Sequence, residues 1–491
     1  MLTKTTLLAA RQCARRAWLM LHEPARATPT PAGQRALRDA GHAVGRLAHA
    51  IFPGAVLVEE RDFAAARART AALVADPRVP AILEAAVEHD GIGVRVDVLE
   101  RLADGAFGLR EVKAGTRVRD VHLDDLAIQR HVLSGAGFRI ASVELVLVDP
   151  DYVRGEGPPE WTRLFQRRDV SAEVVERSAT VAAQADALRA TLAEPEAPAI
   201  EPSPHCSMPY RCEFWEHCTA PLPADWILHF GRVPPEQWAA LRAAGTTRLA
   251  QLKDTDAVPA ALQRARRSLA SDGAVVTPEL AAALADFGPP AEYLDFETVS
   301  AAVPLFPGTQ PYQRVPFQWS LHRLDAAGTL THFDCLATGG GDPRREFAET
   351  LLARTGGRHE PILVYSDFES DVLAEVAEAL PDLAPDIEAV RARLRDLLPI
   401  MRAHVYHPGF RGSFSLKSVA PALVAGFGYG DLTGIRDGAE ATVQLSRLLA
   451  GECDAASAPS VREALRAYCA RDTEALVRLH AALRALLPAP A

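Results

Sequence analysis

The stretch Val94-Arg95-Val96-Asp97-Val98-Leu99, followed fourteen residues after Asp97 by Glu111-Val112-Lys113, decides our interpretation of the N-terminal half of the chain. The alternation of apolar and polar residues in these stretches predicts two strands. Residues two apart on a strand point to the same face, so Glu111 and Lys113 should lie together. If the two strands are neighbours, Asp97 joins them. Two carboxylates and an ammonium then converge, as metal-dependent hydrolysis of a phosphodiester requires.

Lysine is rare in this chain, and that rarity draws attention to Lys113. Of 53 basic residues, the lysines are only Lys4, Lys113, Lys253 and Lys417. Lysine offers a compact ammonium that the wide, planar fork of arginine does not replace. We therefore expect Lys113 to orient an attacking water or to stabilise charge on a phosphate. Gln129 on the following helix and Glu84 on an upstream helix are further candidates, and an exposed hairpin with solvated charges is the alternative.

Length, charge and cysteine content narrow the class of protein. With 491 residues, 48% of them hydrophobic, the chain can form two or three domains. No apolar run approaches the ~18–20 residues of a membrane span. Three arginines interrupt the N-terminal apolar segment, so we expect a cytoplasmic protein without a membrane partner. The net charge of −10 argues weakly against a nonspecific nucleic-acid coat, but it is compatible with an acidic metal site in a nuclease.

The pattern along the chain indicates an α/β protein with three parts. Residues 1–220 form one domain, with helices over 6–21, 33–50, 120–135 and 171–193 and strands near 92–100, 106–113 and 139–149. Residues 221–285 are predicted to be a wholly helical connector, in which the segment around Gly245 faintly resembles a helix-hairpin-helix module. Residues 286–491 alternate strands with helices and form the third part.

Four cysteines stand in a spacing that points to a metal cofactor. Cys206, Cys212 and Cys218 follow one another as C-x5-C-x5-C, and Cys13 stands alone near the N-terminus. Seven cysteines in a large cytoplasmic chain are not a disulfide framework, so this cluster favours metal chemistry. Structural zinc more often uses paired C-x2-C knuckles, which are missing here. A [4Fe–4S] cluster tolerates irregular spacing; a zinc site and unligated cysteines are the alternatives.

The order of these residues resembles a known family of nucleases. Residues 1–220 look like the iron–sulfur RecB-type nucleases of the PD-(D/E)xK superfamily, which include the CRISPR-associated adaptation nucleases. The match runs in chain order through Cys13, Asp97, Glu111, Lys113, Gln129, Cys206, Cys212 and Cys218. The resemblance implies a restriction-endonuclease-like fold, with Mg²⁺ or Mn²⁺ held by Asp97 and Glu111. Gly45-Arg-Leu-Ala-His49 is similar to the family's G-x3-H helix, which would make His49 a further ligand; a solvent-facing histidine is the alternative.

A second set of acids lies in the C-terminal part. Asp295 and Glu297 share one face of a predicted strand, and Tyr468 and Asp472 lie four apart on a predicted helix. This pattern resembles the DnaQ-like 3′–5′ exonucleases of the RNase H-like fold, in their tyrosine variant. The resemblance implies two metal ions held by Asp295, Glu297, Glu369 and Asp472, with Tyr468 orienting a water. Glu369 replaces the family's usual aspartate, and the acids that could serve instead are Asp367, Asp371 and Asp396.

The C-terminal part also resembles an uncharacterised bacterial domain that is commonly found behind RecB-type nuclease domains. The matching stretches are 293–298, 311–320 and 412–418. Taken together, these patterns predict a metal-dependent DNA nuclease with two catalytic centres. We expect it to act on single-stranded DNA or DNA ends in repair, recombination or anti-phage defence, beside a helicase or other defence or repair proteins. The alternatives are an RNA-processing nuclease and a non-catalytic nucleic-acid-binding scaffold with relic sites.

Overall fold

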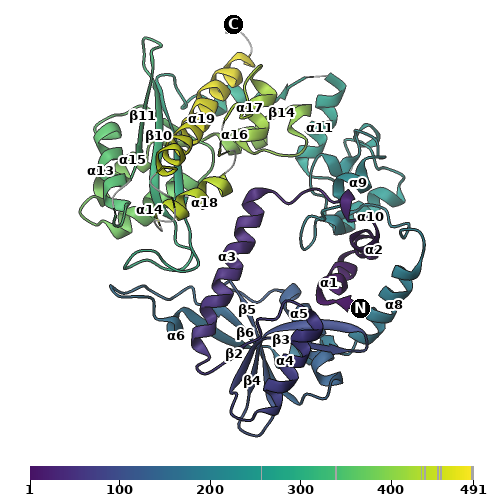
Figure 1. Ribbon diagram of the computed structural model, residues 1–491. Coiled ribbons are helices and arrows are strands. Elements are labelled where there is room, and N and C mark those ends of the chain that lie inside the picture. Colours follow the sequence, from purple (N-terminus) through teal and green to yellow (C-terminus); the bar gives the residue numbers. More distant parts are fainter. Residues whose placement is uncertain are drawn as a thin grey trace. The chain divides into compact units, whose positions relative to one another are not determined.

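The computed structural model divides into two compact units, and both are of mixed α/β type (Figure 1). It describes residues 1–491 except 256, 272, 338–339, 433, 436–437, 450–452, 454–455 and 488–491. The first unit contains Met1–Pro221 and the loop Ala301–Tyr312, and the second contains Leu222–Ser300 and Gln313–Ala491. Among the described residues, no helix is both long and apolar enough to cross a bilayer. The predicted α/β class is confirmed, and the two named folds stay predictions.

A mixed sheet forms the centre of the first unit. The strand order is β2-β3-β4-β5-β6-β7, with β1 beside β4. The strands are β1 Leu2–Thr3, β2 Val56–Leu57, β3 Ala81–His89, β4 Ile92–Arg101, β5 Phe107–Lys113, β6 Ile140–Val148 and β7 Phe165–Asp169. Strands β3, β4 and β5 form an antiparallel meander, and β6 runs parallel to β5. The parallel step is made by helix α5 (Asp120–Gly135), which carries the chain from β5 to β6.

Helices cover both faces of this sheet. One apolar core joins α1 (Lys4–Gln12), α5 and α8 (Val181–Ala193) to residues such as Leu99 and Leu109. The other joins α3 (Ala32–Ala48) to Val98, Val112 and Val146. The remaining helices are α2 Ala14–His22, α4 Phe63–Ala75, α6 Trp161–Leu164, α7 Ser171–Ser178 and α9 Trp215–Thr219. The alternation of strand residues between two buried faces explains why β4, β5 and β6 contain so many aliphatic residues.

Three sequence-based predictions for this unit are wrong, and one of them is the helix expected over 171–193, which is α7 and α8, separated by Ala179 and Thr180. The segment around Glu84 was expected to be helical, but it is strand β3. Alanine, leucine and glutamate favour helices locally, and pairing with β4 overrides that preference. The single helix expected over residues 6–21 is two helices, because Cys13 between α1 and α2 is extended, with φ −164° and ψ 121°.

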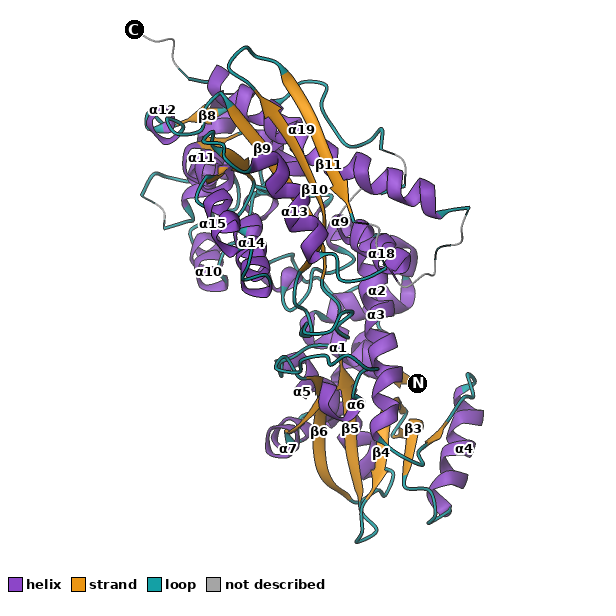
Figure 2. Cartoon of the chain, turned by 90° about the vertical axis from the view of Figure 1, so that its left-hand side faces the viewer, coloured by secondary structure: helices purple, strands orange, loops and turns teal. Residues whose placement is uncertain are grey.

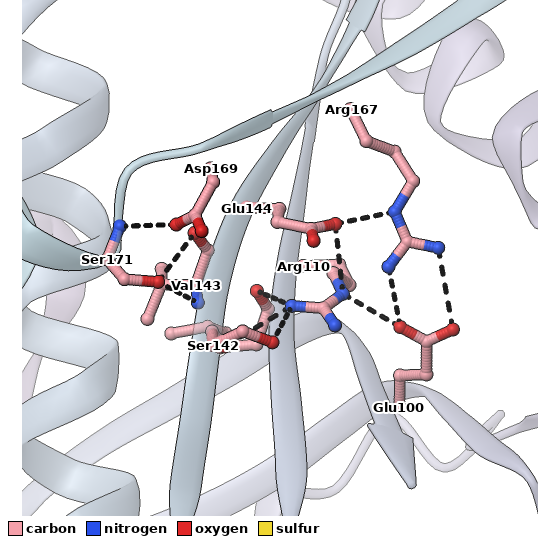
Figure 3. Close-up of polar contacts among 9 residues, drawn as sticks. Glu100, Arg110, Ser142, Val143, Glu144, Arg167, Asp169 and Ser171 are labelled. Atoms are coloured by element: carbon pink, nitrogen blue, oxygen red, sulfur yellow. Dashed lines mark hydrogen bonds and ion pairs between the residues drawn. The ribbon is translucent and has the colours of Figure 1, made fainter. Parts of the chain in front are cut away.

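An ion network around buried Arg110 joins strands of this sheet (Figure 3). Arg110 directly precedes Glu111 on β5, so the two side chains point to opposite faces of the strand. Arg110 is 2% exposed and donates to Glu100 Oε2 at 2.8 Å and to Ser142 Oγ at 2.9 Å. Arg167 on β7 donates to Glu100 Oε2 at 2.7 Å and to Glu144 Oε2 at 2.5 Å. Four neighbouring strands are therefore joined by side chains as well as by the ladder, which gives the Glu111 strand a rigid support.

The second unit contains a five-stranded sheet with the order β11-β10-β9-β12-β13. Its strands are β9 Ala291–Val299, β10 Val315–Leu324, β11 Leu330–Leu336, β12 Ile362–Val364 and β13 Leu394–Asp396. Helices α13 (Arg344–Thr355), α14 (Phe368–Ala379) and α15 (Ala384–Arg391) share a core with Leu294 and Phe296 of β9. Helix α19 (Ala458–Ala485) runs along β9 and β10 (Figure 2). The other helices are α16 Leu397–His404, α17 Leu416–Leu423 and α18 Gly438–Leu449.

The predicted connector belongs to the second unit and is not wholly helical. It contains α10 (Pro235–Ala243), α11 (Ala260–Ser271) and α12 (Leu280–Ala283). It also contains strand β8 (Val275–Val276), which pairs with β14 (Val405–Tyr406). The prediction of an all-helical segment is wrong at β8, where two valines, residues with high strand propensity, meet a partner strand from far along the chain.

Candidate active sites

The first site forms where β4 and β5 run side by side. The ladder pairs Val98 with Arg110, so Asp97 lies opposite Glu111 on the neighbouring strand. Asp97 Oδ2 accepts a hydrogen bond of 2.8 Å from the backbone N–H of Val112. Glu111 is 1% exposed. Burial and the nearby Glu111 carboxylate raise the pKa of Asp97 to about 8. The three predicted residues of this site, Asp97, Glu111 and Lys113, therefore come together.

Helix α5 adds two side chains to this site. Gln129 Nε2, fully buried, donates to Glu111 Oε2 at 2.7 Å and to Asp125 Oδ1 at 2.8 Å. Lys113 Nζ donates to Glu111 Oε1 at 2.6 Å and to Asp125 Oδ2 at 3.0 Å. Asp125 was missed in the sequence, although it stands one helical turn before Gln129. Burial alone would raise the pKa of Asp125, but Lys4 and Lys113 hold it below its ordinary value.

A second lysine reaches the same carboxylates. Lys4 Nζ, from the first residue of α1, lies 2.9 Å from Asp125 Oδ1 and 3.4 Å from Glu111 Oε1. Burial disfavours the Lys4 ammonium, but Glu111 and Asp125 outweigh it and raise the pKa of Lys4. The same balance raises the pKa of Lys113. The low lysine content of the chain is the signal that could have led to Lys4, since arginine serves almost everywhere else.

Glu84 completes the acidic side of the first site. The ladder pairs Leu83 with Val98 and Ala85 with Val96, so Glu84 stands opposite Asp97. Glu84 has a φ of 56°, which is unusual for a non-glycine residue and typical of functional sites. Burial raises the pKa of Glu84, and Glu111 adds to this effect, whereas Arg95, Lys4 and His42 oppose it.

Two histidines of the α3 region are candidates for the first site. His49 lies in the 3-10 turn after α3, where burial and Arg46 lower its pKa. His42, seven residues earlier on α3, is the histidine whose charge acts on Glu84. His49 therefore stays a prediction, and His42 joins it as a candidate ligand.

All four predicted cysteine ligands line one small pocket in the first unit. Cys13 reaches it from the break between α1 and α2, and Cys206, Cys212 and Cys218 reach it from the segment before and within α9. Leu19, Ile200, Pro202, Phe214 and Trp215 supply an apolar lining. Burial raises the pKa of the Cys206 thiol, and Cys13 and Cys218 add to the effect. Four convergent sulfurs in an apolar cage fit a ligand that binds thiolates.

The lining of this pocket provides four thiols, as either a zinc site or a [4Fe–4S] cluster requires. A tetrahedral zinc site, with Zn–S bonds of ≈ 2.3 Å, holds its sulfurs about 3.8 Å apart. Among the described residues, only Asp295, Glu297 and Cys469 bring three potential metal-ligand atoms within 4.8 Å of one another. Among the described residues, no three of the four sulfurs therefore lie within 4.8 Å of one another. The [4Fe–4S] cluster stays a prediction, with zinc as its alternative.

The second site forms between β9 and α19. Asp295 and Glu297 share one face of β9, and a ligand atom of each lies within 4.8 Å of the Cys469 sulfur on α19. Cys469 Sγ donates to Asp295 Oδ2 at 3.4 Å. Asp472, one turn further along α19, is 7% exposed and accepts a hydrogen bond of 2.6 Å from Tyr429. The first predicted acidic motif, Asp295 and Glu297, and the last, which ends at Asp472, therefore lie side by side.

Glu369 is the best placed of the candidate middle acids. It lies in the first turn of α14, is 4% exposed, and its Oε2 has no hydrogen-bond partner. Burial and Asp295 raise the pKa of Glu369 well above its ordinary value. Two of the three alternatives are engaged elsewhere, because Asp371 pairs with Arg314 at 3.2 Å and Asp396 caps α16 through Leu398 N. The third, Asp367, precedes α14, and its carboxylate adds to the raised pKa of Glu369. A buried oxygen without a partner is the kind of group that a cation satisfies.

The second site opens into a cavity of about 570 Å³. Asp295, Glu369 and Asp472 line it together with Lys417 and Arg402, and its aromatic lining residues are Tyr365, Phe368 and Phe414. Lys417 Nζ donates to the hydroxyl of Tyr468 and lies 4.4 Å from the centre of that ring. Three of the four lysines of the chain therefore belong to the two candidate sites.

The two sites differ in charge balance. In the first, Lys4 and Lys113 contact Glu111 and Asp125 directly. In the second, burial raises the pKa of each of four carboxylates, neighbouring carboxylates add to this effect at three of them, and Lys417 opposes it at Asp295, Glu297 and Asp472. The four acids are Asp295, Glu297, Glu369 and Asp472. Such a group is stable in its ionised form only when cations bind it.

Comparison with known proteins identifies one family and no characterised relative. A family described as a domain of unknown function (DUF2779) matches residues 292–415. This stretch contains Asp295, Glu297 and Glu369, whereas Lys417, Tyr468 and Asp472 lie beyond it. No curated protein and no solved structure matches the chain. Any functional conclusion therefore comes from the geometry of the sites.

Proposed function

We propose that this protein is a metal-dependent DNA nuclease with two catalytic centres, the first of them braced by a [4Fe–4S] cluster. The observation that carries the proposal is the set of four carboxylates at the second site, which share one lysine and include a buried oxygen without a partner. Bound at these carboxylates and at those of the first site, Mg²⁺ or Mn²⁺ would neutralise phosphate charge and lower the pKa of a water.

In the second centre, Asp295, Glu297, Glu369 and Asp472 would be the metal ligands. Tyr468 would orient the attacking water, because Lys417 donates a hydrogen bond to the phenol oxygen. Tyr429 holds Asp472 in place through its 2.6 Å hydrogen bond. Burial and the carboxylates Asp472 and Glu297 raise the pKa of Tyr468, so the neutral phenol is the form that binds the water.

In the first centre, Asp97 and Glu111 would hold the metal, with Glu84 and a histidine of α3 or the turn after it beside them. The Lys113 ammonium lies 2.6 Å from Glu111, a proposed metal ligand. It would therefore be close to a phosphate bound at the metal and would stabilise its negative charge. Gln129 positions the Glu111 carboxylate by donating to Oε2, the oxygen that Lys113 does not contact. Cys13, Cys206, Cys212 and Cys218 would hold the cluster, which would tie the N-terminal helices to the end of the first unit.

The second cavity supports a single strand or a DNA end as substrate. Aromatic side chains such as Tyr365, Phe368 and Phe414 provide surfaces on which unpaired bases stack. Arg402 on the same wall offers a charge for a phosphate. A cytoplasmic role in DNA repair, recombination or anti-phage defence, beside a helicase or other repair protein, would suit such an enzyme.

Digestion of labelled substrates tests this function. We expect the purified protein to degrade single-stranded DNA or DNA ends in Mg²⁺ or Mn²⁺, and EDTA to abolish the reaction. Glu369→Gln should lower the rate at which the second centre forms its products at least about 100-fold, whereas Asp371→Asn on the same helix is the matched control and should not. Digestion of RNA but not of DNA would identify an RNA-processing nuclease, and binding of DNA without cleavage would indicate a scaffold. Either result would contradict the proposal.

A further inference from the structure

Helix α1 connects the first site to the cysteine pocket. Its first residue, Lys4, contacts the carboxylates of the site, and Cys13, the residue directly after the helix, lines the pocket. A helix of nine residues is about 13 Å long at 1.5 Å per residue. A short rigid element therefore ends in the candidate active site on one side and in the candidate cofactor site on the other.

The position of Lys4 is unfavourable for the helix itself. It is the first residue of α1, and the first turn contains no acidic residue. A cation at a helix N-terminus is disfavoured by the helix dipole. What stabilises Lys4 there is its ion pair with Asp125 at 2.9 Å and its contact with Glu111 at 3.4 Å. Lys4 therefore contributes to the charge balance of the first site and does not stabilise the helix.

The opposite end of α1 is bound to the segment that carries the cysteines. Gln12 Nε2 donates to the backbone carbonyls of His205 at 3.0 Å and Tyr210 at 2.7 Å, on either side of Cys206. Arg16, just past the break, pairs with Glu213, the neighbour of Cys212, at 3.0 Å. The chain at Cys13 is extended, so α2 does not continue the axis of α1. The contacts of Gln12 and Arg16 with the cysteine segment therefore help to fix the direction of α1.

We propose that Lys4 is a positioning residue of the first site and that the cysteine pocket holds it there through helix α1. This inference rests on the proposed function in one respect, namely that the four thiolates hold a cluster. Loss of the cluster would leave Asp97, Glu111 and Lys113 on the sheet and β1 paired with β4, but it would free α1 to turn about Thr3 and so withdraw the Lys4 ammonium from Asp125. The first centre would then depend on the state of the cluster, and the second, which α1 does not supply, would not.

Amine labelling tests the link without measuring activity. The protein has four lysines, so mass spectrometry can follow acylation at each one separately. In Cys212→Ser protein, and in wild-type protein stripped of its cluster by a chelator, labelling of Lys4 should rise about tenfold. Labelling of Lys417 should stay constant, and exposed Lys253 should react in every sample. The stripped wild type provides the result if the variant does not fold.

Two outcomes would overturn the inference. In one, Lys4 stays protected after visible absorption and iron analysis show that the cluster is gone. In the other, Lys113 becomes labelled together with Lys4, which means that the whole first site has opened and that α1 is not the connection. Iron content is measured before any labelling. A protein that contains no iron as purified would refute the cluster itself, separately from the role of Lys4.

Metal binding separates a positioning role from a merely structural one. Lys4→Met removes a positive charge beside Glu111, so Mn²⁺ should bind the first site about threefold or more tightly while kcat falls. Lys4→Arg should restore part of kcat, because it keeps the charge, and Lys253→Met is the control. Weaker Mn²⁺ binding together with lower kcat in Lys4→Met, and no recovery in Lys4→Arg, would show that Lys4 is only structural.

Discussion

Tyr429 donates a 2.6 Å hydrogen bond to Asp472, from a loop to the last acid of the second site. This bond stabilises the ionised carboxylate, because it lowers the pKa of Asp472 against the burial that raises it. The same phenol lies 5.6 Å from Lys417 Nζ, measured to the ring centre. Tyr429 therefore supports both the metal-ligand side and the lysine side of the site, although nothing in the local sequence around it marked it as a site residue.

Removal of this hydrogen bond should move the pH dependence of the second centre. In Tyr429→Phe the pKa of Asp472 rises, so a higher pH is needed to ionise it and bind metal. The acidic limb of the kcat/KM profile should therefore shift to higher pH. Tyr365→Phe, which removes a hydroxyl from the same cavity, is the matched control. An unchanged acidic limb in Tyr429→Phe would show that Asp472 is not a functional ligand.

The first site should make the metal-free protein less stable at higher pH. The folded-state pKa of Asp97 is about 8, above its ordinary value of 3.8, so the folded protein retains a proton that the unfolded chain releases. Stability should therefore fall as the pH rises from about 4 to about 8. Asp97→Asn should raise Tm at pH 8 in EDTA by about 3 °C or more.

Mn²⁺ provides the check on this prediction. It should raise the Tm of the wild type more than that of Asp97→Asn, because the variant lacks a charged ligand. Asp104→Asn, at an exposed turn, is the control. The contrary result is a lower Tm for Asp97→Asn than for the wild type in EDTA at pH 8. It would mean that the Asp97 carboxylate stabilises the fold as a hydrogen-bond acceptor for Val112 and does not destabilise the metal-free protein.

Gly108 should be essential for the ion network behind the first site. A Cβ at this position would lie 2.1 Å from Arg110 Nη2, and the guanidinium is held by Glu100 and Ser142 (Figure 3). Gly108→Ala should lower the free energy of unfolding by about 2–4 kcal/mol, since it displaces a buried charge from its partners. Gly41→Ala on α3, where nothing lies within 4 Å, should change it by less than about 1 kcal/mol. Equal effects of the two substitutions in chemical denaturation would contradict this role of Arg110.

The cysteine pocket predicts a coloured protein. Anaerobically purified wild type should be brown, with about four iron atoms per chain and broad visible absorption. Cys206→Ser should lose the colour, whereas Cys335→Ser, in β11 of the second unit, should keep it. A colourless protein that contains one zinc per chain would contradict the cluster and favour a tetrahedral zinc site.

Much of the first site could be predicted because its signals are local. Alternation placed Asp97, Glu111 and Lys113 on strands, and the apolar pattern of 120–135 placed Gln129 on a helix. The missed residues depend on long-range contacts. Lys4 and Glu111 are 107 positions apart, and the strand that carries Glu84 is stabilised by pairing with β4 against its own helical preference. Tyr429 likewise reaches Asp472 across 43 residues.

The acid motifs of the second site were predicted from periods of two and four residues. Its lysine was noticed only as a rare residue after an aromatic stretch, and its contact with Tyr468 depends on the packing of α17 against α19. Lysine rarity pointed to residues of both candidate sites, because a residue type that is almost absent has few positions at which its presence needs explanation.

The most direct test of two metal-dependent nuclease centres is a comparison of four proteins on end-labelled single-stranded DNA in Mn²⁺. These are the wild type, Lys113→Met, Asp295→Asn and the double variant, with folding checked by circular dichroism. We predict that each single variant loses one class of product and keeps the other, and that the double variant is inactive. A double variant that digests DNA at the rate of the wild type would contradict the account.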